Sequence, residues 1–250
     1  ENTRVDNQPG IASNHNSIGR VYLSAGRDEA AESHFRTALE IARRQKLPEH
    51  LVQAHSNLAE LYLRREESDK AERELQEARR IADEAQLAQD PIVLHNTAIV
   101  LMRKGSLEEA ETLLRDAAEI NLENRAWGEL AANHYMLAAL QRRREAYPAA
   151  IDEATAALEY DKRGENAPGI ANDLYALGKL YQLSGDNETA YDYYRRSLRV
   201  DIALNRYEPT RRTLTILTEL AREIGRDDAA AEYERQLEVL RDKEDLFAEQ

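Results

Sequence analysis

Residues 18–39, IGRVYLSAGRDEAAESHFRTAL, have the same residue pattern as residues 177–198, LGKLYQLSGDNETAYDYYRRSL. Four further segments share the first part of this pattern, so that a small residue recurs at intervals of 40, 39, 40, 40 and 40 residues. We take this residue as the origin for numbering positions within each repeat: Gly19, Ala59, Ala98, Ala138, Gly178 and Thr218. A period of this length is typical of repeat proteins, in which each unit buries its apolar face by stacking on its neighbours.

The composition excludes several classes of protein. The chain has 250 residues, of which 42% are apolar and 32% are charged, and it contains no cysteine. Without cysteine there are no disulfides, thiolate metal sites or cysteine nucleophiles, and no run of about 18 apolar residues predicts a membrane span. The net charge of −13 at pH 7 opposes binding to the phosphates of nucleic acids. We therefore expect a folded, acidic protein that neither spans a membrane nor binds nucleic acid.

Each repeat is predicted to be two helices joined by a tight turn. Position +7 is glycine in four repeats, which predicts the end of the first helix, because glycine adopts the left-handed C′ conformation without a steric penalty. Position +12 is alanine in all six repeats and position +16 is bulky in four, so that the two helices can approach closely. The residues expected to cap second helices are Asp28, Ser68, Ser106 and Asp186.

The repeated segments resemble the tetratricopeptide repeat over about residues 11–243, most specifically in the first, third and fifth units. Their interval of 40 residues, against 34 in the common form, makes them similar to the long-helix variant of kinesin light chain and of bacterial regulatory proteins. The resemblance implies an all-α, right-handed α-solenoid of about six helix-turn-helix repeats, with about twelve helices and no strands. We expect a polar N-terminal arm at residues 1–8 and a single superhelix over residues 9–248, with fraying after Asp245. The expected repeats are residues 9–46, 48–87, 90–124, 126–163, 167–205 and 207–243.

In such hairpins the first helix of each repeat lines the concave surface, and positions −6, −3, +1 and +4 would form its exposed stripe. We predict a peptide-binding groove whose middle is apolar and aromatic, with arginines beside it at position +5. An apolar side chain of the ligand would enter this groove, and ligand carboxylates would pair with the arginines. The predicted groove residues are Asn16, Arg20, Gln53, Ser56, Glu60, Leu63, Arg64, Ile92, His95, Ile99, Met102, Arg103, Tyr135, Arg142, Arg143, Tyr175 and Lys179. The alternative is that the arginines cap helix C-termini and that the apolar residues pack inside the solenoid.

Residues that could carry chemistry have a simpler structural interpretation. His15, His55 and His134 share position −4, but equivalent residues of successive repeats lie on the order of 10 Å apart, too far to share one metal ion. We expect these histidines to pack between helices. The sequence contains no nucleophile motif, glycine-rich phosphate loop, metal-binding motif or paired-carboxylate signature. We therefore predict neither enzymatic activity nor a metal or other cofactor.

The leading functional hypothesis is a scaffold that binds an extended peptide or a partner helix in its concave groove. Stacked hairpins offer a preformed surface, so little ordering cost falls on the receptor. The expected partner is a protein or peptide with an apolar anchor and acidic residues, and the oligomeric state is left open. Two alternatives are a self-assembling structural module and a regulatory sensor that responds to a small peptide. The first residue is Glu1 rather than Met; the cytoplasm is the favoured compartment, with a periplasmic or secreted protein after signal removal as the alternative.

Overall fold

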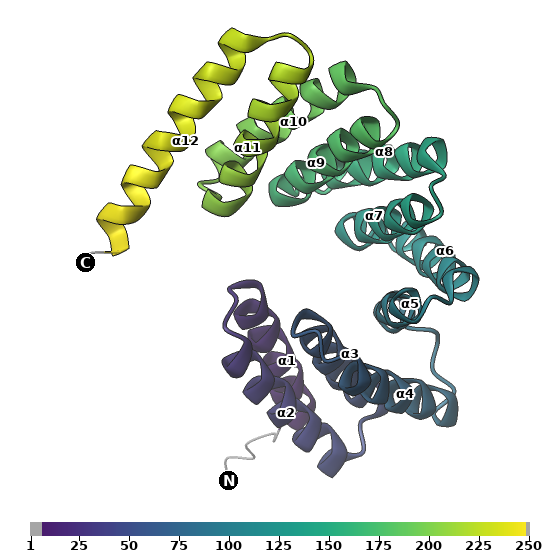
Figure 1. The fold of residues 1–250 in the computed structure, drawn as a ribbon. Helices are drawn as coiled ribbons and strands as arrows, with labels where there is room; N and C mark the ends of the chain where they lie inside the picture. Colours follow the sequence, from purple (N-terminus) through teal and green to yellow (C-terminus); the bar gives the residue numbers. More distant parts are fainter. Residues whose placement is uncertain (1–6, 249–250) are drawn as a thin grey trace. The chain divides into compact units, whose positions relative to one another are not determined.

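The computed structural model describes the backbone of residues 7–248 and the side chains of residues 7–240. Over this part of the chain there are twelve α-helices and no β-strand, which confirms the predicted all-α helical-repeat solenoid (Figure 1). The helices are α1 (Gln8–Ser24), α2 (Asp28–Gln45), α3 (Pro48–Arg64), α4 (Ser68–Glu84), α5 (Pro91–Lys104), α6 (Leu107–Glu123), α7 (Trp127–Arg143), α8 (Tyr147–Arg163), α9 (Ala167–Leu183), α10 (Asn187–Ala203), α11 (Tyr207–Glu223) and α12 (Asp227–Ala248). Odd-numbered helices are the first helices of their repeats, and even-numbered helices are the second.

The predicted polar arm lies outside the described residues except at its end, where Asn7 caps α1 and Gln8 begins it. At the other end of the chain α12 continues to Ala248, and only residues 249–250 lie outside the description. The chain divides into two compact units, Glu1–Ile120 and Asn121–Gln250. The prediction of one uninterrupted superhelix over residues 9–248 stays a prediction.

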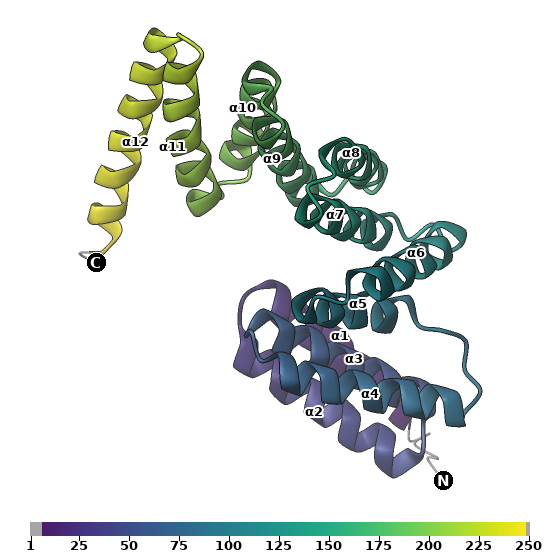
Figure 2. The same ribbon diagram turned by 45° about the vertical axis from the view of Figure 1, so that its right-hand side comes forward.

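In the first unit, α1 pairs with α2 and α3 pairs with α4 as helical hairpins (Figures 1 and 2). The hairpins stack because α2 packs on α3 and α4 packs on α5, while the first helices α1, α3 and α5 also contact one another in order. The core between them is built on Phe35, Leu58, Leu61 and Leu75, whose side chains are at most 2% exposed. First helices therefore lie side by side, as a surface made from them requires.

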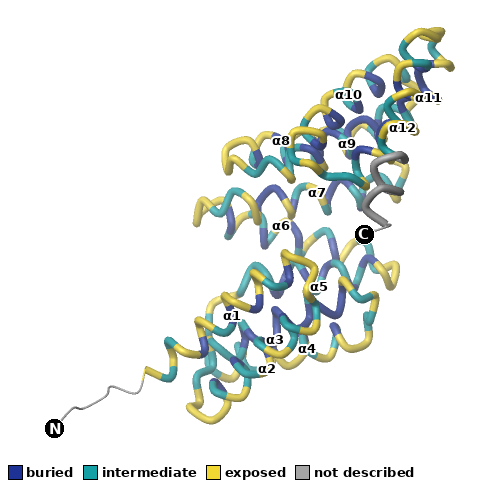
Figure 3. Tube along the Cα trace, turned by 90° about the vertical axis from the view of Figure 1, so that its left-hand side faces the viewer, coloured by how far each residue is buried: buried dark blue, intermediate teal, exposed yellow. Residues whose placement is uncertain are grey.

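The second unit repeats this arrangement with the hairpins α7–α8, α9–α10 and α11–α12. Here α8 packs on α9, α10 packs on α11, and α7 contacts α9. Leu177, Tyr194 and Leu217 are among its fully buried side chains. Figure 3 shows the buried residues along the helix faces that meet and the exposed residues at the turns.

The close approach of the two helices in a repeat depends on a small residue facing a larger one. A Cβ atom added at Gly19 would lie 2.5 Å from Cε1 of Phe35, and one added at Gly178 would lie 2.9 Å from the ring of Tyr194. Where the origin is alanine, as at Ala59, position +16 holds the smaller Leu75. The alanines at position +12 are buried in all six repeats, as predicted: Ala31, Ala71, Ala110, Ala150, Ala190 and Ala230.

The turn inside each repeat has one residue in the left-handed conformation at position +7. Gly26 has φ +70°, and the same conformation is held by Glu66 and Glu145, each with φ 60°, where the sequence has no glycine. After Gly26, the backbone N–H of Arg27 donates to the carbonyl of Tyr22 at 2.9 Å, which is the Schellman bond that satisfies a free helix-end carbonyl. The turns between repeats contain a second left-handed position, +27, that the sequence analysis missed: Lys46, Gln86, Arg125, Glu165 and Asn205.

Of the four predicted helix caps, one is correct and two are wrong, and the fourth, Ser106, directly precedes α6. Asp186 is the N-cap of α10, and its side chain accepts a hydrogen bond from the backbone of Thr189 at 3.1 Å. Asp28 and Ser68 are instead the first residues inside α2 and α4, whose N-caps make no side-chain hydrogen bond. The Asp28 carboxylate lies instead 3.7 Å from Arg64, the last residue of α3, and 3.8 Å from Arg65, which follows it.

Candidate functional site

In the first unit, part of the predicted stripe is buried between neighbouring first helices rather than exposed. The side chain of Asn16 on α1 donates to Gln53 of α3 at 3.0 Å and accepts from Asn57 at 3.2 Å. Asn16 and Ser56 are each 1% exposed, and the backbone carbonyl of Ser56 accepts from Asn96 of α5 at 3.5 Å. The expectation of surface exposure was wrong for these residues, because first helices pack on one another and need hydrogen bonds at that contact.

The apolar residues predicted to line the groove of the first unit are buried to different extents. Leu63 and Met102 are both 5% exposed, so neither offers a surface to a ligand. Ile99 packs against the edge of the core and is half-buried, as are Ile92 and His95. The sequence pattern places these residues on the correct helices but overstates the width of the exposed apolar strip.

The arginines at position +5 of the first unit bind the C-terminal ends of the preceding first helices. Arg64 donates from Nη1 to the carbonyl of Leu23, the last apolar residue of α1. Arg103 donates at 2.9 Å to the carbonyl of Leu63 on α3 and at 2.9 Å to the hydroxyl of Ser68. This is the capping role that the sequence left as the alternative, and it satisfies carbonyls that have no partner inside their helix.

In the predicted groove of the first unit, Glu60 is a carboxylate whose pKa is shifted. Burial raises the pKa of Glu60 on α3, whereas the nearby guanidinium groups of Arg20 and Arg64 oppose that shift. Arg20 is exposed and Glu60 is half-buried. The Glu60 carboxylate therefore interacts with two cations, Arg20 on α1 and Arg64 on its own helix α3.

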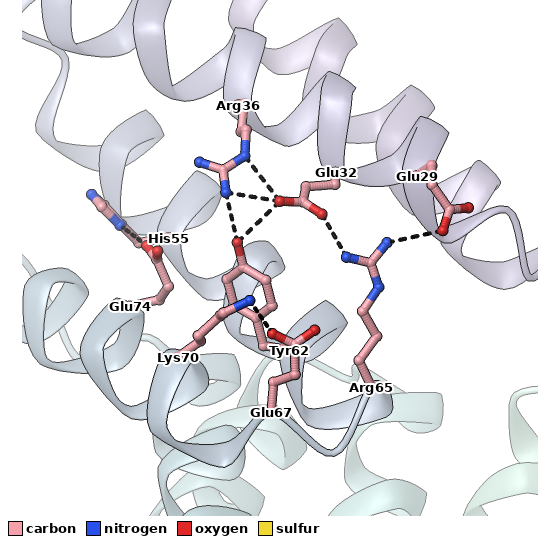
Figure 4. A network of polar contacts seen from close by, with 9 residues as sticks. All are labelled: Glu29, Glu32, Arg36, His55, Tyr62, Arg65, Glu67, Lys70 and Glu74. Carbon is pink, nitrogen blue, oxygen red and sulfur yellow. Dashed lines mark hydrogen bonds and ion pairs between the residues drawn. The ribbon is translucent and has the colours of Figure 1, made fainter.

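A separate polar network joins α2 to α3 in this unit (Figure 4). The Glu32 carboxylate accepts hydrogen bonds from Arg36 at 2.8 Å, Arg65 at 2.5 Å and the Tyr62 hydroxyl at 3.1 Å. Burial favours the neutral acid, but these three donors outweigh it and lower the pKa of Glu32. His55 pairs with Glu74 beside the network, at 2.6 Å. Because Glu32 belongs to the first repeat and Tyr62 and Arg65 belong to the second, the network serves the contact between repeats.

In the second unit, an aromatic and cationic surface lies on successive first helices. The Arg212 guanidinium of α11 lies 4.0 Å from the ring centre of Tyr175 on α9. Tyr135 on α7 is 39% exposed. Burial raises the pKa of its hydroxyl, Asp173 and Tyr175 raise it further, and Arg212 and Arg142 oppose the shift. Tyr135 and Arg142 of α7, Asp173 and Tyr175 of α9, and Arg212 of α11 therefore lie near one another.

Two cations of this surface have no hydrogen-bonded or ion-paired partner in the described part of the chain, although the charge of Arg212 opposes the rise that burial causes in the pKa of Asp201 on α10. Over the described side chains, Arg212 makes no hydrogen bond or ion pair, and neither does the exposed Lys179, which lies one helical turn after Tyr175 on α9. A cavity of about 450 Å³ opens against α11, lined by Glu208, Pro209, Arg211, Arg212, Thr215 and Ile216. We call Tyr135, Tyr175, Lys179 and Arg212 the tyrosine–arginine surface. Arg212 occupies position −6 of the stripe predicted from the sequence, but it is not among the predicted groove residues. Its contact with Tyr175 joins two repeats and is not visible in the pattern of a single repeat.

A buried pair of carboxyl groups lies behind this surface. Asp161 of α8 and Asp173 of α9 are 5% and 2% exposed and share a hydrogen bond. Burial raises the pKa of Asp173 to about 8, and the neighbouring Asp161 adds to the shift. Gly169 permits this arrangement, because a Cβ atom there would lie 1.8 Å from Asp161 Oδ2, and Asn166 donates to Asp161 at 2.9 Å. The sequence analysis missed this pair. Asp161 and Asp173 occupy positions +23 and −5 of successive repeats, where the junction of the first and second repeats has Ala42 and Ala54.

The three histidines at position −4 each contact the second helix of their own repeat, as expected. Nδ1 of His15 lies 2.9 Å from Nδ1 of His34, and His134 pairs with Glu153 at 2.7 Å. Within the described residues, no three or more His, Asp or Glu side chains are grouped so that they could hold a metal ion. No helix in the described part of the chain is both long enough and apolar enough to cross a membrane.

Sequence comparison finds tetratricopeptide repeats in two stretches of the chain. Residues 10–84 and residues 174–206 match models described as tetratricopeptide repeat. No curated protein matches the sequence significantly. The two matched stretches cover most of the first, second and fifth of the repeats defined above.

Solved structures share the fold at low sequence identity. BtubC (BKLC) from P. vanneervenii is 22% identical, with a TM-score of 0.71 over 87% of this chain and 92% of that chain. Pseudomonas aeruginosa pilF is 20% identical, with a TM-score of 0.63 over 97% of this chain and 99% of that chain. The TPR-like repeats of a Podosopora anserina kinesin light chain are 16% identical, with a TM-score of 0.61 over 78% and 96%. At such identities the likeness shows the fold alone.

Proposed function

Because the chain is a tetratricopeptide-repeat protein, a fold that serves as a scaffold for protein–protein interactions, we propose that its second unit binds an acidic peptide on the tyrosine–arginine surface. The observation that carries the proposal is a pair of cations without a hydrogen bond or ion pair among the described side chains: Arg212 lies over the ring of Tyr175, and the exposed Lys179 follows Tyr175 by one turn of α9. An aliphatic or aromatic side chain of the peptide packs on the tyrosines, and an Asp or Glu next to it pairs with the cations. A planar guanidinium binds a carboxylate through two parallel hydrogen bonds, which adds specificity to attraction.

The first unit is the weaker candidate for the same role. Its arginines at position +5 are engaged with helix ends, and Leu63 and Met102 of its apolar stripe are buried. The surface left to a ligand is the exposed Arg20 together with half-buried residues: Gln53, Glu60, Ile92, His95 and Ile99. A groove that continues through both units, as the sequence pattern predicts, stays a prediction. So do the two alternatives of a self-assembling module and a peptide sensor.

The test uses a phage-displayed library of random peptides selected on the full chain. We expect enriched peptides to combine an apolar residue with adjacent Asp or Glu. Their affinity should fall at least tenfold in Tyr135→Ala and in Arg212→Gln, because removal of a central aromatic or arginine contact costs on the order of 2 kcal/mol.

Two control variants separate this surface from general loss of charge or stability. Arg199→Gln removes an exposed arginine from α10, outside the surface, and Arg103→Ala removes a helix-capping arginine of the first unit. Both should bind the selected peptides as the unmodified chain does. Equal affinity of Arg212→Gln and the unmodified chain for every selected peptide would rule the proposal out.

A further inference from the structure

In three junctions between repeats, the second helix and the next first helix each contribute a leucine to one core cluster. The leucine of the second helix lies at position +20, and the leucine of the next first helix lies at position −1. The pairs are Leu39 with Leu58, Leu158 with Leu177, and Leu198 with Leu217. All three leucines at position −1 are fully buried. These pairs therefore help to close the contacts of α2 with α3, α8 with α9, and α10 with α11.

The junction between α4 and α5 lacks both leucines. Position +20 of the second repeat is the exposed Arg79, and position −1 of the third repeat is the half-buried Thr97. The Thr97 hydroxyl donates to the carbonyl of Val93 in its own helix at 2.7 Å, so its polar group is satisfied within α5. The connection is also longer here, because residues 85–90 join α4 to α5 whereas residues 46–47 join α2 to α3. The packing that closes the other junctions is therefore absent.

A cavity of about 390 Å³ occupies this junction in the first unit. Arg79 and Thr97 both line it, so the cavity lies where the two leucines are missing. Its apolar lining comes from three helices: Leu75 of α4, Val100 and Leu101 of α5, and Leu113 of α6. A concave site of this volume, lined by apolar side chains with a few polar groups, is typical of sites for small molecules.

Two opposite charges on the walls of this cavity are free to bind a ligand. Among the described side chains, neither Arg79 of α4 nor Glu109 of α6 makes a hydrogen bond or ion pair, and both are exposed. Glu72, the other carboxylate of the lining, is already paired with Lys104 at 2.6 Å. A ligand that satisfies both free charges carries a carboxylate for Arg79 and a cationic group for Glu109.

We propose that this cavity binds a free amino acid with a large apolar side chain. The side chain occupies the space that a pair of leucines fills in the other junctions. The carboxylate accepts hydrogen bonds from Arg79, and the ammonium group donates to Glu109. Other ligands match only part of the site: a fatty acid brings no cation to Glu109, and an internal residue of a peptide carries neither charge on its backbone.

The test is calorimetric titration of the full chain with leucine and with three of its analogues. The analogue 4-methylpentanoate lacks the ammonium group, 3-methylbutylamine lacks the carboxylate, and N-acetyl-leucinamide lacks both charges. We expect saturable binding of leucine and at least tenfold weaker binding of each analogue, because charged hydrogen bonds are lost. Absence of saturable leucine binding at millimolar concentration, or an analogue that binds as tightly as leucine, overturns the proposal.

Variants locate the binding in this cavity. Thr97→Leu keeps both charges and restores the leucine of the other junctions, so it should abolish leucine binding and raise the urea midpoint by filling the cavity. Arg79→Gln and Glu109→Gln should each weaken leucine binding at least tenfold. The matched controls are Arg73→Gln on α4 and Glu119→Gln on α6, which change exposed residues outside the lining and should bind as the unmodified chain does. Undiminished leucine binding by Thr97→Leu would show that the ligand lies elsewhere and would rule the site out.

Discussion

Gly19 and Phe35 illustrate how residue size is matched between the two helices of a repeat. The Phe35 ring is fully buried, and it occupies the space that a side chain at position 19 would need. Where the origin is alanine, as in the second and third repeats, position +16 is leucine. The packing constraint therefore belongs to the pair of residues rather than to either one.

We expect Gly19→Ala to destabilise the chain by about 1–2 kcal/mol, because the cost of overpacking exceeds the gain in helix propensity. In a Phe35→Leu background the same substitution should stabilise by up to about 1 kcal/mol, since the clash is removed and the gain is kept. Urea unfolding of the four chains measures both effects. Gly128→Ala, where the new Cβ atom would meet nothing within 4 Å, is the matched control and should not destabilise. A destabilising Gly19→Ala in both backgrounds would contradict the size-matching account.

Asp173 predicts a specific dependence of stability on pH. Its pKa is about 8 in the folded chain and about 3.9 when unfolded, so between these values the unfolded state binds fewer protons. The stability contributed by the neutral carboxyl is therefore fully present below about pH 4 and is lost as pH rises through about 8. Asp173→Asn removes this loss and keeps a hydrogen-bond donor for Asp161.

We expect Asp173→Asn to be more stable than the unmodified chain at pH 8 by on the order of 1–3 kcal/mol, with the difference shrinking toward pH 4. Urea midpoints measured at pH 4, 6 and 8 provide the comparison. Asp152→Asn, an exposed change on α8, should follow the unmodified chain at every pH. A difference between Asp173→Asn and the unmodified chain that does not change with pH would show that the carboxyl is not neutral in the fold.

At the scale of secondary structure, the turns are more uniform than their residues. Every turn inside a repeat has a left-handed residue at position +7, whether it is Gly26 or Glu66. The helix lengths and the bonds at the helix ends impose this geometry, and a residue with a Cβ atom adopts it at a cost of roughly 1–2 kcal/mol. The preference of glycine for the left-handed conformation therefore predicts four of these six turns, and the repeat period predicts the other two.

Glu66→Gly should raise the free energy of unfolding by about 0.5–1 kcal/mol, because relief of the left-handed strain exceeds the added freedom of glycine in the unfolded chain. Glu66→Ala keeps a Cβ atom and should give no gain, which makes it the matched control. Thermal or urea unfolding measures the difference between the two variants. Equal stability of the glycine and alanine variants would mean that the turn is not strained.

At the scale of the whole molecule, each repeat is stabilised mainly by its neighbours. Within the first unit α3 has ten buried residues and contacts helices on both sides, whereas α1 has four and is uncovered on one side. We expect hydrogen exchange to be slowest in α3 and faster in α1, since local opening requires less buried surface to be exposed there. Mass spectrometry of peptides from the two helices tests this order. Protection of α1 equal to that of α3 would show that its outward face is covered in solution.

The sequence alone determined the all-α repeat fold, the helix pairs, and the buried alanines at position +12. These features follow from the periodicity of the residues and from residues such as Gly26, whose type predicts the local backbone conformation. Both kinds of information are contained in the linear sequence. The tetratricopeptide resemblance and its scaffold class follow from the same pattern.

The tertiary structure alone decided which residues of the first helices are available to a ligand. Asn16 and Leu63 have the spacing of an exposed stripe but are buried, and Arg64 and Arg103 are engaged with helix ends one repeat away. Likewise Arg212 on Tyr175, and Asp161 with Asp173, are contacts between repeats. Exposure and pairing of this kind depend on how closely successive hairpins stack, and that distance is set by side chains about 40 residues apart, which no local pattern specifies.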